Sequence, residues 1–192
     1  MRLNAIAYYA DFFLCAFAIM ALALCGLFAS ITAGRMTDLA VWIVALPAGL
    51  IAWSLAEYWV HRYFYHEVPI LRDLHEKHHA EPEALIGGPP LLMIVIIFTL
   101  AWLPLIFVSG PVAQGFTIGV LVGYMAYMLV HHAVHHWHSA PGSLLYALRH
   151  HHARHHYRDD DRNFGIITPF WDGVFGTSVP SSASARRRRS SI

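Results

Sequence analysis

Charged side chains are scarce in this sequence. Only 13% of its 192 residues are Asp, Glu, Lys or Arg, against about 25% in typical soluble proteins. There is no charge between Phe12 and Ala33, and none between Ala84 and Val130. At 57% hydrophobic residues, the chain is neither a water-soluble domain nor a disordered segment. Its two cysteines, Cys15 and Cys25, form no CxxC motif and provide no disulfide framework.

The apolar runs predict an all-α integral membrane protein. A bilayer core of about 30 Å requires about 20 apolar residues as a helix. The second long uncharged run is interrupted by Ser109-Gly110-Pro111, which breaks helices. We therefore expect about four transmembrane helices, near residues 12–33, 39–60, 89–108 and 112–131. A signal peptide is the alternative for the first, but its apolar run exceeds the usual ~7–15 residues and no clear cleavage site follows.

The basic residues predict the orientation. With four crossings, every Lys and Arg except Arg35 falls on the side of the two termini. Cytoplasmic loops carry an excess of these residues, so we assign this side to the cytoplasm. A bacterial inner membrane is favoured over the endoplasmic reticulum on Ala and Arg usage. The basic tail, residues 181–192 with Arg186–Arg189, is expected to be disordered, and nucleic-acid binding fits poorly with a net charge of +1.

Fifteen histidines, all between His61 and His156, are the other anomaly. They lie in three stretches, residues 61–79, 131–138 and 150–156, at the cytoplasmic ends of predicted crossings two and four. Residues three and four apart share a helix face. Spacing therefore brings together His75, His78 and His79; His131 and His135; and His152, His155 and His156. His61 and His66 are five apart and are expected to flank a helix end.

Ten imidazoles facing one volume are too many for one metal ion. A structural zinc site takes four ligands and usually includes Cys, whereas ten nitrogens suit two metals. Imidazole alone does not distinguish zinc, copper, iron and nickel. The alternative is a metal-storage or sensing tract, although such tracts usually form one block. The flanking members are expected at the surface or behind the ligands, with His136 the least certain: His132, His136, His138, His150 and His151.

Ligating histidines usually donate their second N–H to a carboxylate, a carbonyl or water. The candidate acids are Glu57, Asp73, Glu76, Asp159, Asp160, Asp161 and Asp172. Glu57 stands out because a carboxylate at a membrane-helix end is costly unless it is paired or functional. Two roles for it stay open: support of a ligand, or an ion pair with Arg62.

The order H-x4-H, H-x2-HH, H-x3-HH, H-x2-HH resembles the fatty acid hydroxylase/sterol desaturase superfamily. The resemblance runs from about residue 57 to 177 and includes Asn163-Phe164-Gly165 and Trp171-Asp172-Gly173-Val174-Phe175-Gly176-Thr177. His75-Glu-Lys-His78-His79-Ala-Glu-Pro82 and Tyr127 resemble its fatty acid 2-hydroxylase branch, although Met128 replaces a frequent Asp.

The resemblance implies a membrane enzyme whose two iron ions insert one oxygen atom from O2 into a lipid C–H bond. Zinc can replace the iron in a purified or crystallised form. The implied ligands are His61, His66, His75, His78, His79, His131, His135, His152, His155 and His156. The implied supporting residues are Glu57, His136, Asn163 and Asp172.

The resemblance also implies partners. We expect a single membrane domain, residues 1–180, without the haem domain that eukaryotic 2-hydroxylases often carry. Electrons then come from a separate reductase, ferredoxin or b-type cytochrome. The substrate is a fatty acyl chain from the bilayer, expected to lie between crossings two and four and to be hydroxylated near its carboxyl end.

The sequence leaves two other functions open. One is a desaturase or hydroxylase of a sterol, carotenoid or lipid head group, which the histidine spacing does not distinguish. The other is a membrane metal transporter or sensor. A transporter would need metal-binding residues near the midplane, where the predicted crossings have no His, Asp or Glu.

Overall fold

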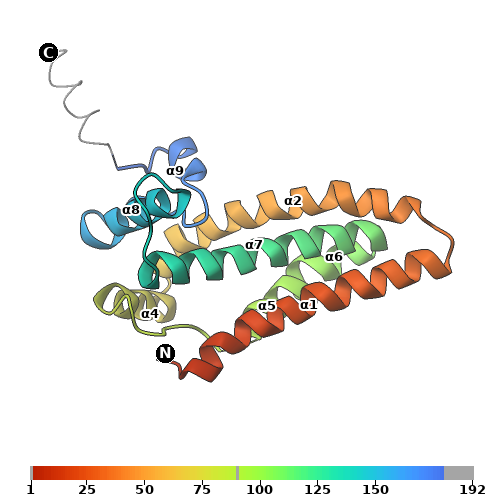
Figure 1. The fold of residues 1–192 in the computed structure, drawn as a ribbon, viewed down its shortest axis with the longest axis horizontal. Coiled ribbons are helices and arrows are strands. Elements are labelled where there is room, and N and C mark those ends of the chain that lie inside the picture. Colours follow the sequence, from red (N-terminus) through yellow and green to blue (C-terminus); the bar gives the residue numbers. More distant parts are fainter. Residues whose placement is uncertain (1, 90, 180–192) are drawn as a thin grey trace, which may run out of the picture.

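The computed structural model describes residues 2–89 and 91–179, and all its regular elements are helices. Long helices run along one axis, and shorter helices gather at one end beside the N-terminus (Figure 1). The predicted basic tail, residues 181–192, lies outside the described residues.

Among the described residues, three helices are long and apolar enough to cross a membrane. They are α1 (Ala5–Thr32), α2 (Thr37–Trp59) with its continuation to Glu67, and α7 (Gly110–His136). Asn4 begins α1, since its side-chain oxygen accepts a hydrogen bond from the Ala7 amide at 2.8 Å. These helices correspond to predicted crossings one, two and four, and each is longer than its apolar run suggested.

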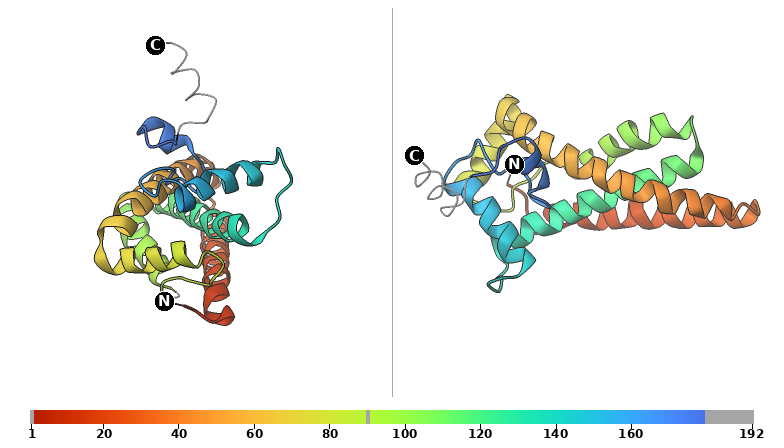
Figure 2. Two further views of the ribbon diagram at one scale, coloured as in Figure 1. Left: turned by 90° about the vertical axis from the view of Figure 1, so that its left-hand side faces the viewer. Right: turned by 90° about the horizontal axis from the view of Figure 1, so that it is seen from above.

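The third predicted crossing is shorter than expected. It consists of α5 (Leu92–Ile97), the π-helical turn η2 (Phe98–Trp102) and α6 (Leu103–Ile106). Together they span 15 residues, about 22 Å at 1.5 Å per residue, less than the ~30 Å bilayer core. The segment lies alongside part of α7 (Figure 2). The structure therefore contains three full-length candidate crossings and one short apolar helical segment.

Glycines bring α2 and α7 into backbone contact. A Cβ at Gly49 would lie 2.1 Å from the Phe116 carbonyl oxygen, and one at Gly119 would lie 2.1 Å from the Leu46 carbonyl oxygen. Gly119 belongs to a series of glycines four residues apart on α7, with Gly115 and Gly123, and small residues at this spacing allow membrane helices to approach closely. At this level no space remains for an acyl chain between the second and fourth predicted crossings, so the expected substrate path is wrong there.

Four further elements gather at one end of the bundle: α3 (Tyr65–Glu67), α4 (Pro69–Ala80), α8 (Leu144–Tyr157) and α9 (Phe170–Val174) (Figure 2). The N-terminal segment is fastened to the loop after α4, because the Leu3 amide donates to the Leu85 carbonyl and Arg2 pairs with Glu81. The histidine stretches of α4, α7 and α8 therefore lie at the same end.

Candidate metal centre

A π-helical turn brings the first two histidines together. The turn η1 (Val60–Phe64) continues α2 directly. Its hydrogen bonds join residues five apart, which widens the helix locally and aligns such residues on one side. The rings of His61 and His66 consequently lie 5.7 Å apart. The expectation that these two residues flank a helix end is wrong, because α-helical geometry does not apply here.

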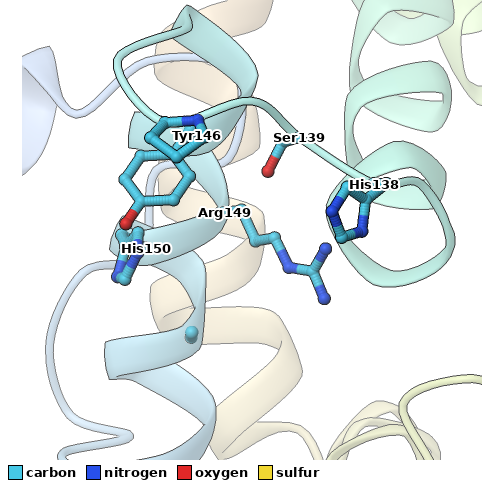
Figure 3. A pocket seen from close by; sticks show the side chains of 7 residues that line it. His138, Ser139, Tyr146, Arg149 and His150 are labelled. Atoms are coloured by element: carbon cyan, nitrogen blue, oxygen red, sulfur yellow. The ribbon is translucent and has the colours of Figure 1, made fainter.

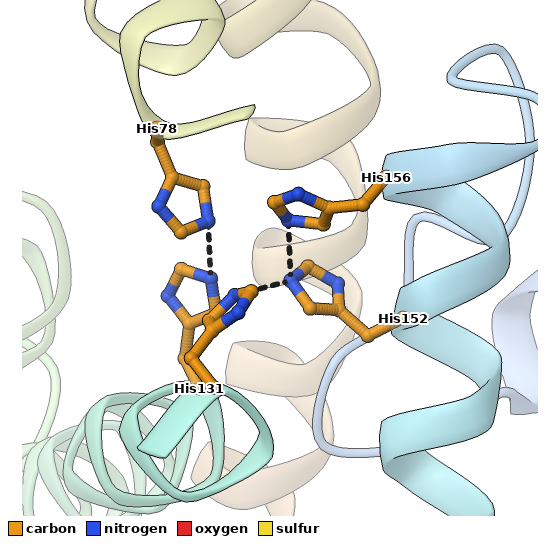
Figure 4. A group of neighbouring side chains, drawn as sticks. His78, His131, His152 and His156 are labelled. Atoms are coloured by element: carbon orange, nitrogen blue, oxygen red, sulfur yellow. Dashed lines mark hydrogen bonds between the residues drawn. The ribbon is translucent and has the colours of Figure 1, made fainter. Parts of the chain in front are cut away.

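Nine of the ten predicted ligands form two groups. Within each group, one side-chain nitrogen of every residue lies within 4.8 Å of the others. The five-histidine group, shown in Figure 4, contains His78, His131, His135, His152 and His156. The four-histidine group contains His61, His66, His75 and His155.

The tenth residue, His79, contacts a member of each group. Its Nε2 lies 3.1 Å from Nε2 of His155, and its ring stacks on His156 at 4.1 Å. Helices α4 and α8 supply residues to both groups, so the two groups share their scaffold. The helical spacings seen in the sequence are therefore the spacings that assemble them.

Backbone carbonyls fix the tautomers of two histidines in the four-histidine group. Nδ1 of His61 lies 2.6 Å from the Phe164 carbonyl oxygen, and Nδ1 of His155 lies 2.8 Å from that of Arg162. A carbonyl only accepts, so each Nδ1 carries the proton and each Nε2 presents a lone pair. These two Nε2 atoms are 2.9 Å apart. Two lone pairs at this distance repel each other unless a cation is shared between them.

Burial disfavours a proton as that cation. It lowers the pKa of His155 and His78 to about 3 and that of His79 to about 4. The pKa values of His75 and His156 are also lowered, by burial first and then by neighbouring imidazoles. Neutral imidazoles are the form that binds metals, so the donor set fits metal ions of the zinc, copper, iron and nickel class.

Some buried nitrogens have no protein partner. Nε2 of His66 and Nδ1 of His152 and His156 are buried without a hydrogen bond among residues 2–89 and 91–179. A buried polar atom without a partner is costly. These atoms are consistent with a site that is completed by bound ions or by water.

The loop after α8 supplies the carbonyls and is held by Asp172. This buried carboxylate accepts hydrogen bonds from the Phe164 and Gly165 amides and from the Thr177 hydroxyl, at 2.9, 2.9 and 2.7 Å. It also pairs with His151 at 2.9 Å. Burial alone would raise the pKa of Asp172, but these hydrogen bonds outweigh it and hold the pKa below its ordinary value. Asp172 thus holds the loop in place, and the histidine that it contacts, His151, is not one of the ten predicted ligands.

Asn163 fastens the same loop. Its amide group donates to the His151 carbonyl at 3.1 Å, and its side-chain oxygen accepts from the Val179 amide at 2.8 Å. Its φ of 58° is left-handed, a conformation that Asn tolerates better than most residues. The sequence did not single out the Arg162 and Phe164 carbonyls, because any residue type carries one.

Glu57 is not the ion-pair partner of Arg62. Its Oε1 accepts hydrogen bonds from the Ile166 and Ile167 amides at 2.6 and 3.0 Å, while Arg62 donates to the Tyr58 hydroxyl. The residue as a whole is 3% exposed. It ties α2 to the loop that orients His61, which is an indirect form of support.

The flanking histidines lie in three different surroundings. His151 is buried against Asp172. His136 is exposed, and its ring stacks on that of His132 at 4.3 Å. Its ring stacking is thus with another flanking histidine rather than with a predicted ligand, and this contact does not support the role implied for it. His138 and His150 line a separate pocket.

A small polar pocket reaches the histidines from outside. It has a volume of about 180 Å³ and is lined by His79, His155 and His156, with Tyr157–Asp160 completing the wall. It is large enough for water or a diatomic gas and too small for an acyl chain.

Comparison with known proteins agrees with this arrangement. The fatty acid hydroxylase family model matches residues 46–177, more than half of the chain. Fatty acid 2-hydroxylase of Mus musculus is 32% identical over 173 residues, 82% of this chain and 46% of that protein. Dihydroceramide fatty acyl 2-hydroxylase FAH2 of Arabidopsis thaliana is 28% identical over 149 residues, 72% of this chain and 62% of that protein.

The fold also matches a solved structure, full-length scs7p with only its hydroxylase domain visible. The TM-score is 0.70 with 24% identity, and the match covers 92% of this chain and 70% of the other. At this identity the likeness concerns the fold. The chain spans less than half the length of the rat and mouse relatives that it matches. The matched family model nevertheless includes every predicted histidine ligand, and the chain belongs to the fatty acid hydroxylase family.

Proposed function

We propose that this protein is a membrane lipid hydroxylase that inserts one oxygen atom from O2 into a C–H bond of a fatty acyl chain, at carbon 2. The observation that carries this proposal is the pair of nitrogen-rich groups, with opposed lone pairs on His61 and His155. The names of the mouse and Arabidopsis relatives, both 2-hydroxylases, support the carbon position.

The ten histidines would hold two iron ions. The five-histidine group and the four-histidine group would bind one each, and His79, which contacts both, would join one of them. When bound, the iron pair supplies the oxidising power that an unactivated C–H bond requires. The carbonyls of Arg162 and Phe164 keep the imidazole lone pairs directed inward, and Glu57 and Asp172 hold the loop that carries them.

Substrate and oxygen would reach the site from different directions. The contact of α2 and α7 at Gly49 and Gly119 closes the middle of that interface, so the acyl chain would approach nearer the histidine end. The polar pocket beside His79 and His156 would admit small molecules. Two electrons would come from a separate reductase, ferredoxin or b-type cytochrome.

The positive charges support a cytoplasmic location for the histidine end. Arg62, Arg72 and Lys77 lie on it, whereas Arg35 lies at the opposite end of α1. A bacterial inner membrane is the compartment that composition favours.

Mass spectrometry of hydrolysed total lipid tests this proposal. The chain is produced in a host that supplies a ferredoxin and its reductase, beside His135→Ala and the matched control His132→Ala. His132 lies on the same helix but outside both groups. We expect 2-hydroxy fatty acids from wild type and control only. A hydroxyl at another carbon, or a double bond, would overturn the assigned reaction, and an unchanged profile from iron-loaded protein would overturn hydroxylation of acyl chains.

A further inference from the structure

A second polar pocket lies on the opposite side of α8 from the histidine groups. It has a volume of about 390 Å³ and lies where α7 connects to α8. Its polar lining is His138, Ser139, Tyr146, Arg149 and His150 (Figure 3). At 100° per residue, positions 146, 149, 150 and 153 form one side of the helix, and 148, 151, 152 and 155 form the buried side. One helix thus serves two separate sites.

The lining is rich in hydrogen-bond donors and includes no acidic residue. Arg149 donates to the Trp137 carbonyl at 2.9 Å, the one hydrogen bond of its side chain within the part of the chain described. A guanidinium has five N–H donors, so several stay available. Figure 3 shows the guanidinium extending toward His138, with the Tyr146 hydroxyl next to His150. The rings of Tyr146 and His150 lie 4.4 Å apart.

Exposed apolar side chains lie close to this pocket in the sequence. Trp137 follows the last residue of α7 and is 53% exposed, and Leu144, at the start of α8, is 76% exposed. Trp is enriched at the membrane–water interface. The pocket therefore lies at the end of α7, a candidate membrane-spanning helix, beside exposed side chains of the type found at the membrane–water interface.

We propose that this pocket binds a phosphate group. A guanidinium matches the geometry of phosphate oxygens and binds them with charge-assisted hydrogen bonds, and the Ser139 and Tyr146 hydroxyls and two imidazoles provide further donors. The phosphate can belong to a lipid head group or to a soluble phosphate. This site goes beyond the proposed hydroxylation and does not depend on it, since no ligand histidine lines it.

Native mass spectrometry of the full-length protein in detergent tests the proposal. The probes are short-chain phosphatidic acid, uncharged diacylglycerol of the same chain length, and inorganic phosphate. The variants are Arg149→Ala and His150→Ala, and the control is Arg72→Ala, an exposed arginine on α4 outside the pocket. Loss of charge-assisted hydrogen bonds predicts at least about tenfold weaker phosphatidic acid binding in Arg149→Ala, a smaller loss in His150→Ala, and none in the control.

Two comparisons distinguish the sources of the phosphate. Binding of phosphatidic acid without inorganic phosphate supports a lipid head group, and binding of both supports a soluble phosphate. Equal affinity of Arg149→Ala and Arg72→Ala, or of phosphatidic acid and diacylglycerol, would overturn the proposal. If Arg149→Ala misfolds for lack of its bond to Trp137, His150→Ala and Tyr146→Phe retain that bond and carry the same test.

Discussion

At the scale of single residues, the least expected feature is how few side chains orient the histidines. Backbone carbonyls of Arg162 and Phe164 orient His155 and His61. The side chains of Glu57 and Asp172 bind the loop that carries these carbonyls and make no hydrogen bond to the two histidines. The sequence indicates the ten histidines as candidate ligands, because metal binding by imidazole is a property of the residue type. It could not predict the carbonyls, because their position depends on the path of the loop.

Replacing His155 should remove metal from the protein. His155→Ala deletes an Nε2 that lies within 3.4 Å of three other imidazole nitrogens. We expect metal content to fall by at least one ion per chain, measured by plasma mass spectrometry, whereas His132→Ala keeps its metal. Full occupancy in His155→Ala would show that this residue is not a ligand.

Replacing Glu57 should destabilise the protein without removing a ligand. Glu57→Ala leaves the buried Ile166 amide and the neighbouring Ile167 amide without their acceptor, at a cost of about 3 kcal/mol for the pair. Glu57→Gln retains an acceptor oxygen and should lose less. Thermal unfolding in detergent measures both, and equal stability of Glu57→Ala and wild type would contradict the role assigned to this carboxylate.

At the scale of elements, hydropathy predicted helices and missed their irregularities. The π-helical turn at Val60–Phe64 aligns His61 with His66. Nothing in the hydropathy of these residues distinguishes the turn from a regular α-helix. The short helical segment Leu92–Ile106 has the composition of a crossing without the length. Hydropathy and periodicity report the helical class of a segment, and they do not register a local change of hydrogen-bond pattern or the length over which the helix continues.

The contact between α2 and α7 should not tolerate even one added methyl group. A Cβ at Gly119 would lie 2.1 Å from the Leu46 carbonyl oxygen, so Gly119→Ala should cost about 1–3 kcal/mol through overpacking. Gly173→Ala is the control, because nothing lies within 4 Å of its added Cβ. Thermal unfolding of the two variants side by side gives the comparison. A Gly119→Ala protein as stable as wild type would mean that the helices lie further apart.

At the scale of the whole molecule, the histidine cluster couples stability to pH. Burial lowers the pKa of His78 and His155 to about 3 and that of His79 to about 4, against about 6.5 in an unfolded chain. Between these values the unfolded state binds more protons, so stability falls as pH falls from about 6.5 toward 4. Metal-free protein should therefore unfold at a lower temperature at pH 5 than at pH 7.5. An unchanged or higher temperature at pH 5 would contradict the burial of these imidazoles.

The general architecture could be anticipated from the sequence, because long apolar runs and repeated histidine spacings are properties of whole segments. The helical class, three helices long enough to be crossings and the gathering of the histidines at one end follow from them. The sequence did not indicate that the middle of the interface between crossings two and four is closed to an acyl chain. Gly49 and Gly119 close it by bringing the two backbones together. That residues 1–180 form one domain stays a prediction.

Metal stoichiometry is the most informative single measurement. Protein purified from iron-supplemented cells should contain two iron ions per chain. His66→Ala, in the four-histidine group, and His131→Ala, in the five-histidine group, should each retain about one, because each group would bind its own ion. Wild-type protein with a single ion, or with variable loading that neither substitution changes, would contradict a two-metal centre built from these histidines.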